Sequence, residues 1–142
     1  MTPGKAIIAP GGKHMKVIKV RGDGYRVKLT DEPKDLVYIQ SADVLMESAA
    51  ETYGRRVLGI ILTGMGDDGL RGMRRIKEMG GVTIAQDEES CVVFGMPKAC
   101  IEAGVVDEVL NLEGISRRLA EIADAGGTSK GESGELARFY GL

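Results

Sequence analysis

The sequence has little of what metal-binding and disulfide-linked proteins use. It contains two cysteines, Cys91 and Cys100, and a single histidine, His14. Two cysteines do not make a disulfide framework, and these three residues do not have the spacing of a zinc site. We therefore expect no metal, and no residue pattern indicates a resident cofactor.

Long apolar runs and an excess of basic charge are also absent. No run approaches the roughly 20 apolar residues that cross a bilayer, and the apolar stretch near the N-terminus is too short for a signal peptide. The formal net charge is −2, and neighbouring arginines occur only as isolated pairs. We predict a cytoplasmic protein that neither inserts into a membrane nor binds nucleic acid.

The composition that remains is that of one ordinary globular domain. The chain has 142 residues, of which 43% are hydrophobic and 28% charged, so it can build one core and does not have the composition of a disordered chain. The last residues are rich in glycine and serine. We expect one folded domain over residues 1–124 and a flexible tail over residues 125–142.

The first third of the chain predicts strands and then one helix. The apolar residues 5–9 predict a short strand, and residues 14–20 and 25–29 alternate around a Gly-Asp-Gly turn that is typical of an antiparallel hairpin. Helical spacing begins after Ser41, which can cap a helix, and Gly54 can end it.

The rest of the chain alternates regularly between strand and helix. We expect a mostly parallel, doubly wound α/β sheet in three layers (αβα), with the hairpin near its N-terminus. The expected strands cover residues 57–62, 82–85 and 105–110, and the expected helices cover residues 68–79, 97–103 and 115–123.

The stretch Ile61-Leu-Thr-Gly-Met-Gly-Asp-Asp-Gly69 lies between an expected strand and an expected helix. Its glycines fit the GxGxxG spacing of dinucleotide-binding turns, with Asp87 near the end of the next strand. However, Asp67 and Asp68 would set negative charge where a pyrophosphate should bind. Dinucleotide binding is therefore the weaker hypothesis.

Two other interpretations use the aspartates directly. An aspartate at the carboxyl end of a parallel strand can orient a histidine in a hydrolytic triad, while glycines expose amides that receive an oxyanion. Alternatively, Asp67 and Asp68 only cap the helix that follows them. The turn by itself does not separate these two alternatives.

Three stretches identify a family resemblance: APGGKHM at 9–15, the segment 42–73 with ILTGMGDDG, and the segment 80–112 with AQDEESCVVFGMP. Together they resemble the C-terminal portion of the catalytic domain of the chemotaxis receptor methylesterases, the CheB family. The resemblance implies a serine hydrolase that cleaves glutamyl methyl esters, and deamidates certain glutamines, on the cytoplasmic domain of chemoreceptors. It also implies that Asp68 is the triad aspartate and that the backbone amide of Met65 helps to form the oxyanion hole.

The chain departs from the family pattern in two places. The family's nucleophile lies in a GxSxGG turn and its base in a QHMP-like motif, and this sequence contains neither, nor the receiver domain. Residues 37–45 also differ from the Arg-Pro-Ser-Val-Asp pattern of the family. We therefore expect this polypeptide by itself to lack esterase activity, and we keep a non-catalytic receptor-binding or scaffold module as the alternative. An incomplete sheet should expose a strand edge, so we expect self-association.

A substitute nucleophile is conceivable, because a cysteine can act when a base lowers its pKa. Cys91, His14 and Asp68 would form such a set, but nothing in their spacing supports it. We expect Cys91 to be a core or near-core residue and His14 to be a hydrogen-bonded structural histidine.

Overall fold

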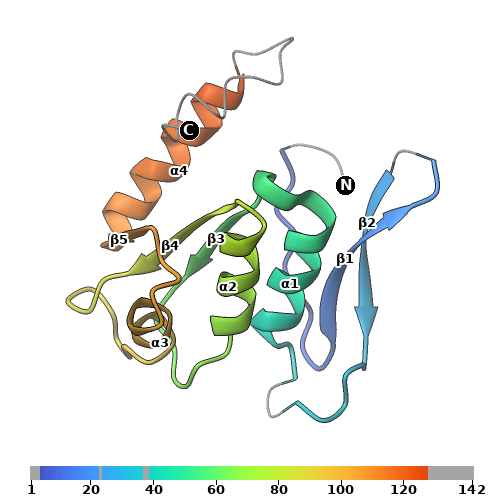
Figure 1. Ribbon diagram of the computed structural model, residues 1–142, viewed down its shortest axis with the longest axis horizontal. Helices are drawn as coiled ribbons and strands as arrows, with labels where there is room; N and C mark the ends of the chain where they lie inside the picture. The colour runs from blue at the N-terminus through green and yellow to red at the C-terminus, as the bar shows by residue number, and fades with distance from the viewer. Residues whose placement is uncertain (1–3, 23, 37–38, 128–142) are drawn as a thin grey trace. The chain divides into compact units, whose positions relative to one another are not determined.

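The computed structural model describes residues 4–22, 24–36 and 39–127 (Figure 1). The chain divides into two compact units, residues 1–111 and residues 112–142. In the described part of the second unit, residues Leu112–Gly127 form helix α4. This helix is longer than expected and includes the start of the predicted tail, whereas residues 128–142 of that tail lie outside the described residues. No described helix is long and apolar enough to cross a membrane.

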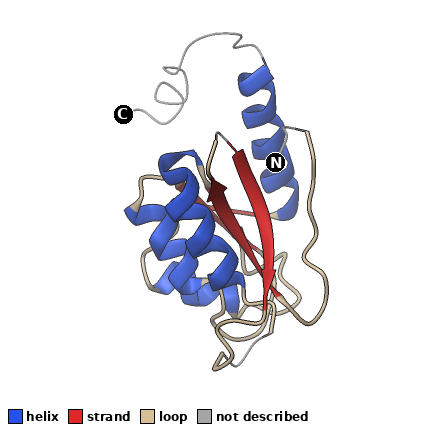
Figure 2. Cartoon of the chain, turned by 90° about the vertical axis from the view of Figure 1, so that its right-hand side faces the viewer, coloured by secondary structure: helices blue, strands red, loops and turns tan. Residues whose placement is uncertain are grey.

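The first unit begins with the predicted hairpin. Strand β1 (His14–Val20) pairs antiparallel with β2 (Gly24–Thr30), and helix α1 (Ala42–Tyr53) lies along the other edge of β1 (Figure 2). The amide of Val17 donates to Ser48 Oγ at 3.0 Å, and Thr52 Oγ1 donates to the Val17 carbonyl at 3.1 Å. Two hydroxyls of α1 therefore occupy backbone groups that β1 would otherwise expose.

The regular second half confirms the predicted parallel α/β fold. A short 3₁₀ helix, η1, follows α1, and three strands then form a parallel sheet in the order β3-β4-β5. The bounds are η1 Gly54–Arg56, β3 Leu58–Ile61, α2 Leu70–Glu78, β4 Val82–Gln86, α3 Met96–Glu102 and β5 Glu108–Leu110. Two bounds differ clearly from the predictions, because β5 begins three residues later than expected and α2 begins two residues later.

The predicted strand at residues 5–9 is wrong. The segment is not a strand, and Ile8 is 90% exposed. An apolar sequence becomes a strand only where a neighbouring strand takes its backbone hydrogen bonds, and the sequence pattern cannot say whether such a neighbour exists.

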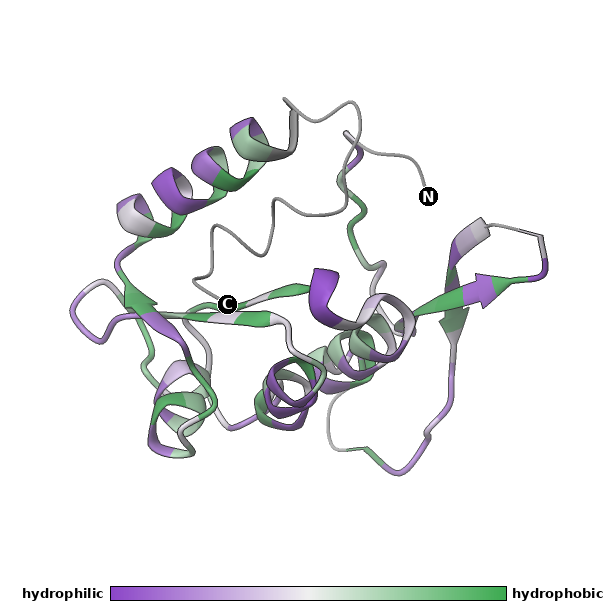
Figure 3. Cartoon of the chain, turned by 45° about the horizontal axis from the view of Figure 1, so that its top comes forward, coloured by the Kyte–Doolittle hydropathy of each residue, from purple (hydrophilic) through white to green (hydrophobic). Residues whose placement is uncertain are grey.

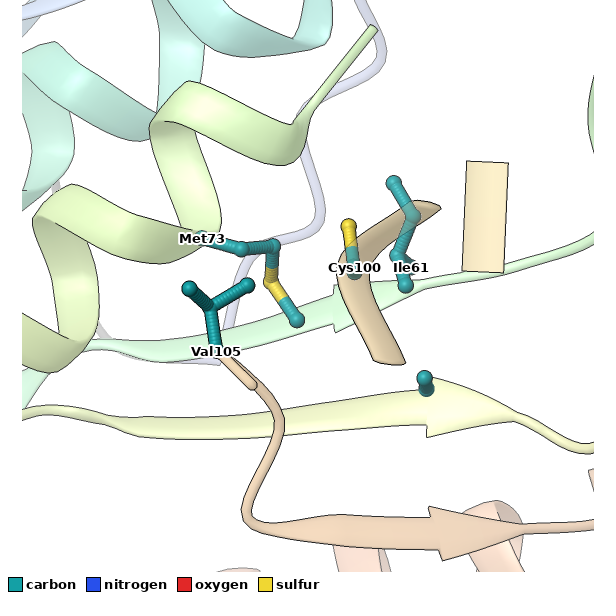
Figure 4. Packing of buried hydrophobic residues seen from close by; sticks show 5 residues of the cluster. Ile61, Met73, Cys100 and Val105 are labelled. Carbon is teal, nitrogen blue, oxygen red and sulfur yellow. The ribbon is translucent and has the colours of Figure 1, made fainter. Parts of the chain in front are cut away.

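Helices α2 and α3 cover one face of the parallel sheet. The core between these helices and the sheet contains Ile61, Met73, Ala85, Cys100 and Val105 (Figure 4). Burial raises the pKa of the Cys100 thiol to about 11, so this cysteine acts as a small apolar residue. Figure 3 shows that α1 and α2 carry hydrophilic and hydrophobic residues on different sides, as a helix half-buried against a core requires.

Helix α1 packs closely on α2 at Gly72. A Cβ at this position would collide with the Cβ of Met46, and it would lie 3.3 Å from the Cα of Asp43. Arg71 and Arg75 on α2 extend the contact through ion pairs with Glu47 and Glu51. These successive contacts show that the two helices run in the same direction, so their N-termini lie together.

A second polar contact fixes α2 and β4 to the residue before β5. Asp107 accepts hydrogen bonds at 2.9 Å from both the amide and the hydroxyl of Thr83, and it pairs with Lys77. Desolvation raises the pKa of Asp107, but the bonds from Lys77 and Thr83 outweigh it, and the resulting pKa lies below the ordinary value of 3.8. The folded state therefore favours the ionised carboxylate.

This lowered pKa predicts an acid-sensitive contribution to stability. A depressed carboxyl stabilises the fold above its unfolded pKa, and the contribution disappears as the pH falls through the folded value. We expect Asp107→Asn to be less stable at neutral pH and to lose less stability than the unmodified chain between about pH 5 and about pH 2. Urea unfolding at several pH values measures this difference. Glu89→Gln, at an exposed carboxylate, is the control; parallel curves for Asp107→Asn and the unmodified chain would contradict the prediction.

Candidate functional site

The segments after β3 and β4 meet at the carboxyl edge of the parallel sheet. Gly64 forms an isolated bridge with Phe94, its amide donates to the Val93 carbonyl at 3.0 Å, and its carbonyl accepts from the amides of Gly95 and Met96 at 2.9 and 2.8 Å. A side chain at Gly64 would collide with Met96 Sδ. The glycine thus allows the segment that follows β4 to lie directly against the ILTGMGDDG turn.

Gln86, the last residue of β4, hydrogen-bonds to both of these segments. Its side chain is 1% exposed; its Oε1 accepts from the Thr63 amide at 2.8 Å, and its Nε2 donates to the Ser90 carbonyl at 2.8 Å. Thr63 Oγ1 also donates to the Val93 carbonyl and accepts from the Val93 amide. A buried amide with these bonds holds the turn in one position.

Asp68 is half-buried and has three hydrogen-bond donors, all from the N-terminus of α1. Its Oδ1 accepts from Ser41 Oγ at 2.6 Å and from the Asp43 amide at 3.1 Å, and its Oδ2 accepts from the Ala42 amide at 2.7 Å. Amides at a helix N-terminus lack intrahelical partners and carry partial positive charge. The carboxylate is therefore held in a fixed orientation.

The interpretation of Asp67 and Asp68 as caps of the following helix is wrong. Gly69, at φ 98°, occupies the N-cap position of α2, and no side chain caps this helix from there. Asp68 caps α1 instead. The helix that Asp68 caps begins 26 residues earlier in the chain, and residue types next to Asp68 carry no signal for a partner at that separation.

Asp43 makes the matching contact in the other direction. It belongs to the first turn of α1 and is 7% exposed; its Oδ1 accepts from the Gly72 amide at 2.8 Å and its Oδ2 from Arg71 Nε at 3.0 Å. This hydrogen bond is the main reason that the pKa of Arg71 is raised. Each helix therefore supplies, in or just before its first turn, the carboxylate that caps the other.

His14 contacts Ser41, the residue just before α1, and is 3% exposed. The Ser41 amide donates to its Nδ1 at 3.2 Å, and its Nε2 lies 3.2 Å from the Pro33 carbonyl. Since Nδ1 accepts and a carbonyl can only accept, the ring proton is on Nε2. The predicted structural histidine thus fixes the backbone of Ser41.

Met65 lies at the exposed tip of the turn, where 77% of its surface is accessible. The flanking residues are fixed, because Gly64 is bonded to the segment after β4 and Asp68 to α1. An amide in such a turn can donate to a ligand without reorganisation, which is the requirement for stabilising an oxyanion. The role that the resemblance implied for Met65 stays a prediction.

The conceivable set of Cys91, His14 and Asp68 is not assembled, as expected from its spacing. Both ring nitrogens of His14 are engaged with backbone groups, and Cys91 instead interacts with Thr63. Burial, foremost, and the neighbouring acidic residues raise the pKa of Cys91, so its thiolate is disfavoured. Among the described residues, no group of three His, Cys, Asp or Glu side chains could hold a metal ion.

The geometry also gives no support to dinucleotide binding. The amide of Gly72 in the first turn of α2 already donates to the carboxylate of Asp43, so an anion of the protein occupies the helix end that a pyrophosphate would need. Asp87, the acidic residue near the end of the next strand, accepts from the amide and hydroxyl of Ser90.

Sequence reasoning missed four residues of this site: Ser41, Asp43, Thr63 and Gln86. Ser41 was expected only as a cap for its own helix, a bond that it does not make. The available signal for Gln86 was a polar residue directly after the predicted strand 82–85, at its carboxyl end. No local signal indicated that the Ser-x-Asp of residues 41–43 would face the aspartate of the later turn.

Comparisons with known proteins give one consistent result. The family model for CheB methylesterase matches residues 1–119. A protein-glutamate methylesterase/protein-glutamine glutaminase from Chromobacterium violaceum is 53% identical over 82% of this chain and 33% of its own length. One from Nitratidesulfovibrio vulgaris is 50% identical over 80% of this chain and 30% of its own length. The chain thus spans about a third of the length of these curated relatives.

A solved structure is also similar. The Thermotoga maritima CheB methylesterase catalytic domain has a TM-score of 0.76 and 39% sequence identity, with 80% of this chain and 60% of that chain covered. The similarity therefore extends from the sequence motifs to the fold.

Because Asp68 caps α1 and Asp43 caps α2, we expect the two residues to be energetically coupled. Removing either carboxylate leaves helix-end amides without partners, and we expect Asp43→Ala and Asp68→Ala each to lower the free energy of unfolding by about 2 kcal/mol. Because both bonds hold the same helix junction, the double variant should lose about 1 kcal/mol less than the sum of the single losses. Urea unfolding measures all three, with Asp67→Ala as the exposed neighbouring control. Additive losses would show that the two caps act independently.

Proposed function

This chain belongs to the CheB methylesterase family, and we propose that it supplies the triad aspartate and an oxyanion-hole amide for hydrolysis of glutamyl methyl esters on chemoreceptors. Deamidation of receptor glutamines is the second reaction of the same site. Because the substrate lies on the cytoplasmic domain of the receptor, the protein acts in the cytoplasm. The observation that carries the proposal is the Asp68 carboxylate, held by three donors at the carboxyl edge of the sheet.

The chemistry assigned to Asp68 is orientation and charge stabilisation. In a serine hydrolase the serine oxygen attacks the ester carbonyl carbon while the histidine takes its proton. The ester C–O bond then breaks, and the histidine gives the proton to the leaving oxygen, which departs as methanol. Water hydrolyses the acyl-enzyme by the same steps, giving the glutamate carboxylate and the free serine. The aspartate stays ionised and holds the imidazole in one tautomer. An anion fixed by helix-end amides suits this role.

The backbone amide of Met65 has the complementary role. The tetrahedral intermediate carries negative charge on the former carbonyl oxygen, and an amide already in place stabilises that charge without reorganisation. The bonds of Gly64 and the Gln86 side chain support the turn and keep this amide in position.

This sequence contains neither the GxSxGG motif that carries the family's serine nor the QHMP-like motif that carries its histidine. The residues present can orient a base and stabilise an oxyanion, but they provide no nucleophile for the covalent step. We therefore expect the purified 142-residue polypeptide to be inactive by itself and to become active with a polypeptide that carries the family's Ser and His motifs.

A receptor-binding module without catalysis is the second candidate. It is favoured by four apolar side chains that are exposed at the same edge of the sheet: Leu62 (43%), Met65 (77%), Val92 (90%) and Val93 (45%). Exposed apolar groups around a site are typical of protein contact surfaces. Receptor binding without ester cleavage, even in the presence of the Ser and His polypeptide, would favour this candidate.

The open edge of the sheet leads us to propose self-association as well. In the described part of the chain, β3 pairs only with β4, and its four residues, Leu-Gly-Ile-Ile, include no charge. An uncharged strand edge invites pairing with another chain, whereas β5, at the opposite edge, carries Glu108.

Methanol release from methylated chemoreceptor tests the catalytic proposal. We expect none from this chain by itself and release from its mixture with the Ser and His polypeptide. Asp68→Ala should reduce the release by about 10⁴-fold, as for other triad aspartates, whereas Asp67→Ala should leave it unchanged. Activity of the isolated chain would refute the claim of inactivity, and an inactive mixture would refute the half-enzyme.

Sedimentation velocity tests self-association. We expect a dimer or larger species that dissociates on dilution, and Ile60→Lys on β3 should shift it toward monomer because a lysine disfavours edge pairing. Val109→Lys on β5 is the matched control at the opposite edge. A monomer at all concentrations would contradict the proposal, and equal effects of both variants would place the interface away from β3.

A further inference from the structure

The shortest hydrogen bond to Asp68 comes from the hydroxyl of Ser41. Ser41 is 5% exposed, and its Oγ lies 2.6 Å from Asp68 Oδ1. A carboxylate can only accept, so the serine hydroxyl is the donor, and a short bond to an anion is the stronger kind of hydrogen bond. The hydroxyl is therefore committed to Asp68 and does not cap its own helix.

The three donors leave the carboxylate with limited remaining capacity. An ionised carboxylate has about four acceptor positions, two on each oxygen. Ser41 Oγ and the Asp43 amide use both positions on Oδ1, and the Ala42 amide uses one on Oδ2. One acceptor position remains, on Oδ2 of a half-buried side chain. Rotation of the carboxyl would exchange the oxygens and move this position.

The backbone of Ser41 is also fixed by a hydrogen bond. Its amide donates to His14 Nδ1, and the opposite ring nitrogen of His14 bonds to the Pro33 carbonyl. The helix that carries Ser41 is in turn bonded to α2 through Asp43 and the Gly72 amide. The serine is thus fixed through its backbone while its hydroxyl holds the carboxylate.

We propose that Ser41 is a positioning residue for Asp68: its hydroxyl fixes the rotation of the carboxyl so that the free position on Oδ2 faces the histidine of the assembled triad. This inference rests on the proposed function. Without the hydroxyl, the two helix amides still bind the carboxylate, but its two oxygens can exchange places more readily by rotation of the carboxyl group. The loss should therefore affect the orientation of the base and leave substrate binding unchanged.

Two measurements on Ser41→Ala test the proposal. For the isolated chain, amide hydrogen exchange at Ala42 and Asp43 should accelerate roughly five- to tenfold, the equivalent of one weakened hydrogen bond. In the methanol assay with the Ser and His polypeptide, kcat should fall about tenfold or more, since small misplacements of catalytic groups are costly, and KM should not change. Ser48→Ala is the matched control, because it removes a bonded hydroxyl of α1 that contacts Val17 instead of Asp68.

Faster exchange together with a lower kcat in Ser41→Ala, and not in Ser48→Ala, supports the positioning role. Unchanged exchange in Ser41→Ala overturns it, whether or not the assembly is active. Faster exchange with an unchanged kcat also overturns it, because the bond would then serve only the fold. An inactive mixture of unmodified chains is a failure of the proposed function; it appears before any Ser41 variant is compared, and it removes the reaction that Ser41 would serve.

Discussion

Two carboxylates, each of which caps the neighbouring helix, hold the N-termini of α1 and α2 together at the candidate site. Helices α1 and α2 run in the same direction, so two sets of unpaired amides with partial positive charge lie at one end of the pair. Asp68, just before α2, caps α1, and Asp43, in the first turn of α1, caps α2. Gly72 permits the close approach that both bonds require. The residue with the proposed catalytic role is therefore also part of the helix junction.

The rest of the site is arranged around this junction by the parallel sheet. Strands β3 and β4 bring the ends of two motifs to one edge, where Gly64 and the buried amide of Gln86 join them. The turn between these bonds presents the Met65 amide, and its far end presents Asp68. Electrostatic stabilisation in enzymes depends on dipoles that do not move during the reaction. A turn fixed at both ends meets that condition, as the proposed role of Met65 requires.

The differences between expectation and structure have a common physical cause. The hairpin and the strand and helix alternation were predictable, because each depends on periodicity within a short segment. The segment 5–9 looks like a strand but has no strand partner among the described residues, and Asp68 looks like a cap for the next helix but caps a previous one. Both errors concern hydrogen bonds to residues far away in the sequence, which local patterns do not encode.

The sequence by itself determined the family, the parallel α/β order and the identity of the aspartate and glycine turn, because these depend on residue types at short spacing. Only the tertiary structure decided what Asp68 binds, that Ser41 and Asp43 belong to the same site, and that Gln86 supports it. The physical reason is that a carboxylate takes its donors from whichever amides the packing of helices brings within about 3 Å. In this chain, the crossing at Gly72 decides which amides those are.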